Sequence, residues 1–304
     1  MFGFQGRSDG RPARRPGGGE PSAFRSTLIA LASTVVFFGA LAWIVVSSPG
    51  WPAIQRSFLN GRVFAASLPS IVGSFAVNVQ LFLIAEVLIL ALGLVIAVLR
   101  SLPGPVFFPV RLVTTIYVDV FRALPGVLVI YILGFGIPGL GLAGVPIEPF
   151  FYAVVALTLI YSAYVSEVYR AGIESIHPSQ DAAARSLGLS RFQSLRYVIL
   201  PQAVRRVVPP LLNDFIGLQK DTVLVSYIGV VEIFRQSYIK QAGSFNFTPY
   251  LATALVFLVV TIPLARLTDW LIARESRRRQ GGAALALTGT QGRAVAGGPT
   301  GGAR

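Results

Sequence analysis

The sequence predicts an all-α membrane protein with about six spanning helices, and two features indicate it. The first is composition: of the 304 residues, 54% are hydrophobic and only 13% are charged, whereas soluble domains carry about a quarter charged residues. The second is that apolar residues form several continuous runs of about 18 residues or more, the length that a helix needs to cross a bilayer. The runs do not alternate as barrel strands do, and lipid offers the backbone no hydrogen-bond partner, so the spans are expected to be helices.

Six apolar runs give the order of the expected spans. They cover about 27–46, 71–99, 107–135, 150–169, 207–231 and 250–273. The first run follows several arginines, as a signal peptide would, but Ser47–Gly50 is a poor cleavage site and the run is long enough to cross. Pro125 and Gly126 are expected to kink the third span.

The same pattern divides the chain into five segments. They are a disordered basic tail (1–26), an extra N-terminal transmembrane helix (27–47), an external linker (48–69), the main transmembrane domain (70–274) and a disordered C-terminal tail (275–304).

The net charge of +13 indicates topology rather than a nucleic-acid partner. Most basic residues lie in the N-terminal tail, beside Arg100, in 170–206 and in 274–279, which fall on one side of a six-span protein. The loops of the opposite side hold few. The positive-inside rule therefore predicts that both termini are cytoplasmic.

Cysteine and histidine usage excludes several kinds of site. The chain has no cysteine, so it forms no disulfide and no thiolate metal site. It has one histidine, His177, next to Pro178, which is expected to be a surface residue. No metal site and no catalytic residue are predicted.

The polar segment 174–201 is predicted to form two short helices with a break between them. Ser179 can N-cap the first, which contains three consecutive alanines. Gly188 fits the left-handed end of that helix. Ser190 and Gln193 have the spacing of a capping box at the start of the second. A short exposed helix of this kind is suited to a groove on a partner protein.

This segment resembles the cytoplasmic "EAA" loop of permeases from ATP-binding-cassette (ABC) importers. The matching residues are Ala183, Ala184, Leu187, Gly188, Leu200 and Pro201. Ala182 stands where the family has glutamate, and Asp181 precedes it. The resemblance implies that the loop contacts an ATPase subunit. The residues implied in this coupling are Ser179, Asp181, Ala182, Ala183, Ala184, Leu187, Gly188, Leu200 and Pro201.

Two further stretches resemble the polar amino-acid permeases of that family. Tyr117–Pro125 contains Phe-Arg-Ala-Leu-Pro, and Pro209–Ser226 contains Lys-Asp-Thr and Leu-Val-Ser. The resemblance covers roughly 70–274 and implies the transmembrane domain of a type I ABC transporter in the bacterial inner membrane. It also implies a second permease subunit, identical or paralogous, two ATPase subunits, and an extracytoplasmic binding protein that delivers the amino acid.

ATP hydrolysis is expected to belong to the partner. A phosphate-binding loop needs Gly-Lys-Ser or Gly-Lys-Thr, and neither Lys220 nor Lys240, the only lysines, has this setting. ATP and Mg²⁺ are therefore expected on the ATPase subunit, and this chain is expected to be no enzyme.

Polar residues at membrane depth are costly, so they indicate a role. The candidates for the substrate pathway are Asn78, Glu86, Asn213, Asp214 and Lys220. Asp214 and Lys220 would receive the ammonium and carboxylate groups of an amino acid. Glu86 is either a pathway acid or, as we favour, part of an interhelical hydrogen bond. For Lys220 a structural pair with Asp221 is the favoured alternative.

Two other functions fit the composition less well. A membrane enzyme acting on lipid would need clustered catalytic residues, which one histidine and no cysteine do not supply. A secondary transporter would show similar halves, and none is evident.

Overall fold

The computed structural model describes residues 23–296, which form helices joined by short turns, with no strand among them. This confirms the all-α fold class. The chain divides into two compact units, 1–56 and 57–304. In the first, α1 (Ala23–Val46) exposes every described side chain, as expected of an apolar helix surrounded by lipid.

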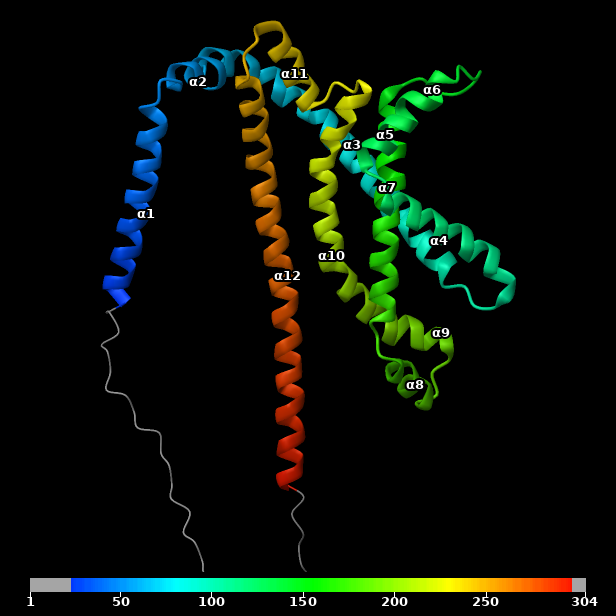
Figure 1. Cartoon of the computed structure of the whole chain (residues 1–304). Helices are drawn as coiled ribbons and strands as arrows, with labels where there is room; N and C mark the ends of the chain where they lie inside the picture. The colour runs from blue at the N-terminus through cyan, green and yellow to red at the C-terminus, as the bar shows by residue number, and fades with distance from the viewer. Residues whose placement is uncertain (1–22, 297–304) are drawn as a thin grey trace, which may run out of the picture. The chain divides into compact units, whose positions relative to one another are not determined.

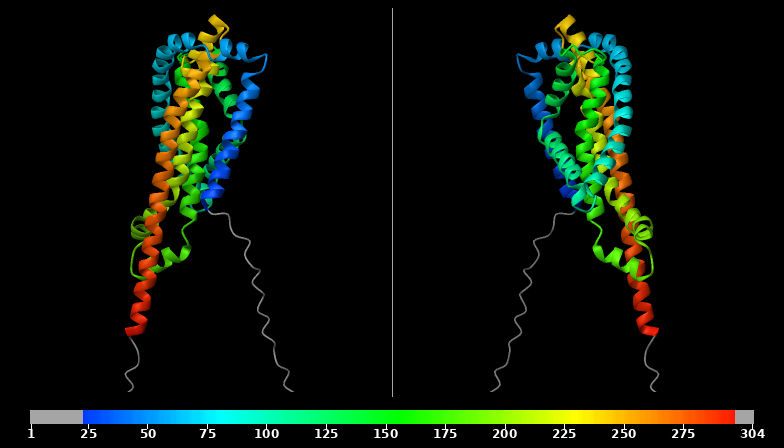
Figure 2. Two further views of the ribbon diagram at one scale, coloured as in Figure 1. Left: turned by 90° about the vertical axis from the view of Figure 1, so that its left-hand side faces the viewer. Right: turned by 90° about the vertical axis from the view of Figure 1, so that its right-hand side faces the viewer.

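The second unit is a bundle of long helices (Figures 1 and 2). They are α3 (Gly61–Arg100), α7 (Pro149–Glu174), α10 (Leu200–Asp221) and α12 (Thr248–Ala296). The pair α3 and α7 shares the largest contact. Gly93 makes this close approach possible, because a Cβ atom there would lie 2.7 Å from Cγ1 of Val165.

The expected third span is broken rather than gently kinked. Its segments are η1 (Pro105–Phe107), α4 (Phe108–Ala123), α5 (Gly126–Tyr131), the π-helical η2 (Ile132–Gly136) and α6 (Ile137–Gly139). The chain bends by 108° between the two halves, Pro105–Ala123 and Gly126–Gly139. Leu124 is extended (ψ 139°), the conformation that a following proline imposes, so the α-helix ends before Pro125.

The expected fifth span ends earlier as an α-helix than predicted. α10 stops at Asp221, and η4 (Thr222–Ile228) continues as a 3₁₀ helix up to Gly229, whose φ is +94°. Helix α11 (Ile233–Ser244) follows and leads to α12.

The two ends of this unit carry different elements. The short helices α8 (Pro178–Ser186) and α9 (Arg191–Ser194) lie at one end, and α6 and α11 lie at the other (Figure 1). We call these the α8 end and the α11 end.

In the described part of the chain, four helices are long and apolar enough to cross a membrane, or five spans if the bent pair α4–α6 is one. α10 does not pass the same test because it carries charged residues such as Arg206 and Asp214. It nevertheless packs against α7 and α12 within the bundle. With α10 included, the described residues agree with the prediction of about six spans.

Two predicted boundaries differ from the structure. The linker expected at 48–69 is largely helical, since it contains α2 (Trp51–Phe58) and the start of α3. Asn60 N-caps α3 by accepting hydrogen bonds from the backbone N–H groups of Arg62 and Val63, so the helix begins well before residue 70.

The tail from residue 275, predicted to be disordered, continues α12 as far as Ala296. Five alanines and four arginines in residues 275–296 favour helix, although the four glycines of this stretch do not. Residues 1–22 and 297–304 lie outside the described residues, and with them most of the predicted N-terminal tail and the end of the C-terminal one.

Candidate functional site

Helix α8 begins at a different residue from the one predicted. His177, not Ser179, is the N-cap: its Nδ1 atom accepts a hydrogen bond of 3.2 Å from the Ser179 backbone N–H. Pro178 occupies the first turn, where its missing N–H costs no hydrogen bond, and this places the cap one residue before it. The histidine is exposed, as predicted, but it has a structural role.

The end of α8 confirms the prediction for Gly188. Its φ is +87°, a conformation that glycine adopts without strain. Its N–H donates to the Arg185 carbonyl (3.0 Å), and the N–H of Leu189 donates to the Ala184 carbonyl (3.3 Å). These two bonds form a Schellman motif, which ends the helix at a defined angle.

The capping box at the start of α9 is also present. Ser190 Oγ accepts from the Gln193 N–H, and Gln193 Oε1 accepts from the Ser190 N–H. From α9 the chain continues through the π-helical η3 (Leu195–Ile199) directly into α10. Leu200 and Pro201 therefore lie in one continuous helical path that links the α8–α9 segment (residues 174–201) to the bundle.

Helix α8 packs one face against the rest of the subunit and exposes the opposite face. On the inner face, Ala184 is buried and Asp181 accepts a 2.6 Å hydrogen bond from Ser194 Oγ. On the outer face, Ala182 and Ala183 are exposed and Leu187 is 85% exposed. The residues of the predicted motif thus form both an internal contact and a free apolar surface.

The bundle contains a polar cavity of about 330 Å³, which we call the Asp214 cavity. It lies where the α4–α5 break meets α7, α10 and η4. Its lining residues are Leu124, Gly126, Ile160, Tyr161, Tyr164, Asn213, Asp214, Gly217, Asp221 and Leu224. The break at Pro125 therefore has a consequence: it opens space beside the carboxylates of α10.

The two carboxylates of this cavity differ in their partners. Asp221 accepts a 2.7 Å hydrogen bond from the Tyr161 hydroxyl. Oδ2 of Asp214 is buried and has no hydrogen-bond partner within the described residues. A buried carboxylate oxygen without a donor is unfavourable, so Asp214 is suited to receive a donor from a ligand.

The predicted Lys220–Asp221 pair is wrong. Lys220 is exposed and does not line the cavity, while Asp221 bonds to Tyr161 instead. Successive helix positions are 100° apart, so Lys220 and Asp221 point in different directions.

Two other predicted pathway residues lie outside the cavity lining. Glu86, on α3, is partly buried and is not among the lining residues. Asn78 is fully engaged in a buried network: Nδ2 donates to Thr222 Oγ1 and to Glu232 Oε2 (both 3.0 Å), and Oδ1 accepts from the Ile233 N–H (3.1 Å). Burial raises the pKa of Glu232, while bonds from Asn78 and two backbone N–H groups oppose that rise. Asn78 thus joins α3 to the start of α11.

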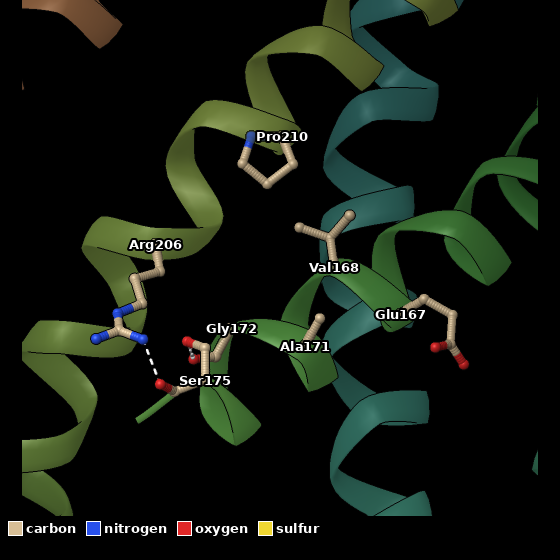
Figure 3. Close-up of a pocket in the computed structure, with 7 residues that line it drawn as sticks. All are labelled: Glu167, Val168, Ala171, Gly172, Ser175, Arg206 and Pro210. Atoms are coloured by element: carbon tan, nitrogen blue, oxygen red, sulfur yellow. Dashed lines mark hydrogen bonds between the residues drawn. The ribbon is translucent and has the colours of Figure 1, made fainter. Parts of the chain in front are cut away.

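A second hollow, of about 410 Å³, lies between α7 and α10 nearer the α8 end, and we call it the Arg206 groove. Figure 3 shows its lining, Glu167, Val168, Ala171, Gly172, Ser175, Arg206 and Pro210. Arg206 Nη1 donates to the Ser175 carbonyl. The helices touch at Gly172, where a Cβ atom would lie 2.1 Å from Cγ1 of Val207.

Comparison with known proteins identifies the family and the fold. The family described as the binding-protein-dependent transport system inner membrane component matches residues 89–277, which include the Asp214 cavity and the α8–α9 segment. The chain belongs to this family. It is therefore a membrane-spanning permease subunit of an ABC importer, a transport component, as the sequence resemblance implied.

Relatives of this permease are amino-acid transport proteins by name. The glutamine transport system permease protein of Escherichia coli (strain K12) is 37% identical over 198 residues, 64% of this chain and 87% of the relative. The arginine transport system permease protein of Bacillus subtilis (strain 168) is 33% identical over 205 residues, 66% of this chain and 91% of the relative.

Solved structures share the permease fold. The crystal structure of an amino acid ABC transporter with histidines has a TM-score of 0.62 and 32% identity, covering 68% of this chain and 94% of the solved one. An inward-facing methionine ABC transporter, at 17% identity and a TM-score of 0.54, shares the fold alone, over 67% of this chain and 95% of its own.

The sequence analysis of this permease did not identify Tyr161, Tyr164 and Asp221 as cavity residues. Two spacings carried the signal. Asp221 follows Asp214 by seven residues, two helical turns, so both face the same side of α10. Tyr161 and Tyr164 are three residues apart within a helical span, which places both side chains on one face of α7.

Proposed function

We propose that this permease subunit imports amino acids and that the ammonium group of the substrate binds Asp214 in the cavity. The observation that carries the proposal is that Asp214 lines the cavity and that its Oδ2 atom is buried with no hydrogen-bond partner among the described residues. An ammonium group supplies the missing donors and neutralises the charge.

The other walls suit the rest of a small zwitterion. Tyr161 and Tyr164 line the cavity, and aromatic ring faces attract cations, as the Arg122 guanidinium 5.8 Å from the centre of the Tyr164 ring illustrates. The side-chain amide of Asn213, which lines the cavity, can donate to the substrate carboxylate, whereas Lys220, expected in this role from the sequence, does not line the cavity. A volume of about 330 Å³ is at the small end of the range for ligand pockets, about 300–1,000 Å³, which suits a single amino acid.

Energy comes, in this proposal, from ATPase subunits that bind ATP and Mg²⁺. The exposed face of α8, with Ala182, Ala183 and Leu187, docks into a groove on such a subunit. The positive-inside rule places the α8 end and both termini in the cytoplasm. The complete importer includes a second permease subunit and an extracytoplasmic binding protein that delivers the amino acid at the α11 end.

Reconstituted uptake tests this function. The complex with its ATPase subunits and binding protein is placed in vesicles, and the uptake of labelled glutamine and labelled arginine is measured. Asp214→Asn removes the charge but keeps the shape, and uptake is expected to fall about 10- to 100-fold, because hydrogen bonds to charged groups contribute about 1.5–3 kcal/mol.

Lys220→Gln is the matched control, because it alters a charge six residues away on the exposed side of the same helix. It is expected to leave uptake unchanged. Normal uptake by Asp214→Asn would show that the substrate binds elsewhere. ATP hydrolysis by the purified permease subunit alone would contradict the proposal that a separate subunit hydrolyses ATP.

A further inference from the structure

The Asp214 cavity and the Arg206 groove lie one after the other between the same two helices. Both are bounded by α7 on one side and α10 on the other. From Asp214 to Arg206 is eight residues, about 12 Å along the axis of α10 at 1.5 Å per residue. The groove thus leads from the cavity toward the α8 end.

The helix spacing shows that one face of each helix lines both spaces. On α7 the lining residues follow one another at intervals of three or four: Tyr161, Tyr164, Val168, Ala171 and Ser175. On α10 the same spacing links Asp221, Gly217, Asp214, Pro210 and Arg206. Residues at these intervals share a helix face, so the same face of α7 and the same face of α10 line both the cavity and the groove.

We propose that the Arg206 groove is the route by which the amino acid leaves the Asp214 cavity for the cytoplasm. The proposal rests on the proposed function, since it needs a substrate in the cavity and the α8 end in the cytoplasm. Figure 3 shows the side chains of Val168 and Ala171 on α7 and of Pro210 and Arg206 on α10 bordering the groove.

The chemistry of the groove fits release rather than storage. Val168, Ala171 and Pro210 are apolar and offer no hydrogen bond to a zwitterion, and the Glu167 carboxylate in the lining is already paired with Arg100 and Arg170, so the substrate is held weakly there. At the far end, the Arg206 guanidinium can receive the departing carboxylate. The tight contact of Gly172 with Val207 closes the floor, so that the route follows one side of the helix pair.

Cysteine modification in the reconstituted importer tests the route. Because the chain has no cysteine, Ala171→Cys introduces the only thiol of this subunit. A bulky, membrane-impermeant thiol reagent applied at the α8 end is expected to attach there and lower the uptake of labelled glutamine or arginine about tenfold, a modest added barrier.

Ile173→Cys is the matched control. Ile173 is also exposed on α7 but does not line the groove, so its modification is expected to leave uptake unchanged. Val168→Cys, on the same face as Ala171, is a second test position in case Ala171→Cys fails to assemble. The unmodified subunit treated with the same reagent corrects for thiols on the other components.

The outcomes separate the two proposals. Uptake by the cysteine-free complex without reagent tests the proposed function. The difference in uptake between the reagent-treated Ala171→Cys and Ile173→Cys complexes tests the route. Equal uptake by the two modified variants would overturn the route while leaving the function intact. A disulfide between Ala171→Cys and a second permease copy would also overturn it, because the groove would then be a subunit contact.

Discussion

Ser194 Oγ donates a hydrogen bond of 2.6 Å to Asp181 Oδ1, and this bond joins α8 to the helical path that leads into α10. Asp181 immediately precedes Ala182, the position at which the resemblance expects glutamate. The Asp181 carboxylate is therefore engaged inside the chain. In the proposed function, this bond is a second link, besides the chain itself, through which a movement of α8 would reach α10.

Ser194→Ala is expected to weaken coupling without preventing assembly. It leaves the partly buried Asp181 carboxylate without its donor, at a cost of about 1–3 kcal/mol to the docking of α8 on α9. The measurement is the stimulation of ATPase activity by substrate-loaded binding protein, which should fall several-fold. The double variant Asp181→Ala, Ser194→Ala should lose no more than the single ones, since both remove the same bond. Additive losses would mean that the two residues act separately.

Gly188→Val is expected to lower transport and stimulated ATPase activity together, with the subunit still inserted. A β-branched residue at φ +87° costs about 1–2 kcal/mol or more. Gly188→Asn is the control, because asparagine tolerates this conformation, and it should retain most activity. If Gly188→Asn were as impaired as Gly188→Val, side-chain bulk at the partner contact would be the cause instead of backbone strain.

Much of the α8–α9 segment was predictable because its signals are local. Gly188 and the pair Ser190–Gln193 bond to residues within a few positions, so their spacing predicts their geometry. His177 was harder to assign, since a histidine cap is unusual and the proline that follows it decides the register. The Asp181–Ser194 bond could not be foreseen, because it depends on how two helices fold back on each other.

The cavity could be predicted only in part for the same reason. Asp214 was identified because a carboxylate within a span is costly. The residues that line the cavity opposite Asp214 come from α7 and from the break at Pro125, and nothing in the sequence of a single helix indicates them. Asn78 was predicted to belong to the substrate pathway, because its buried partner, Glu232, is 154 residues away and could not be foreseen.

Asn78→Ala is expected to destabilise the subunit. It removes the donor to Glu232, a fully buried carboxylate, and the acceptor of the Ile233 N–H. The loss should be about 3 kcal/mol or more, measured as reduced thermal stability in detergent. Gln80→Ala, an exposed position two residues away, is the control and should be nearly neutral. An unchanged melting temperature with lost uptake would instead make Asn78 a substrate contact.

Crosslinking can locate the ATPase contact on α8 with two adjacent residues. Ala183 is exposed and Ala184 is only 3% exposed, although both belong to the predicted motif. In the cysteine-free chain, Ala183→Cys is expected to crosslink to the ATPase subunit, whereas Ala184→Cys should not, because its side chain faces the chain's own interior. Successive residues of a helix point about 100° apart, so this contrast reports which face docks. Labelling of Ala183→Cys only from outside the cell would contradict both the orientation and the coupling role. Equal crosslinking at the two positions would mean that α8 leaves its place on α9 when the ATPase binds.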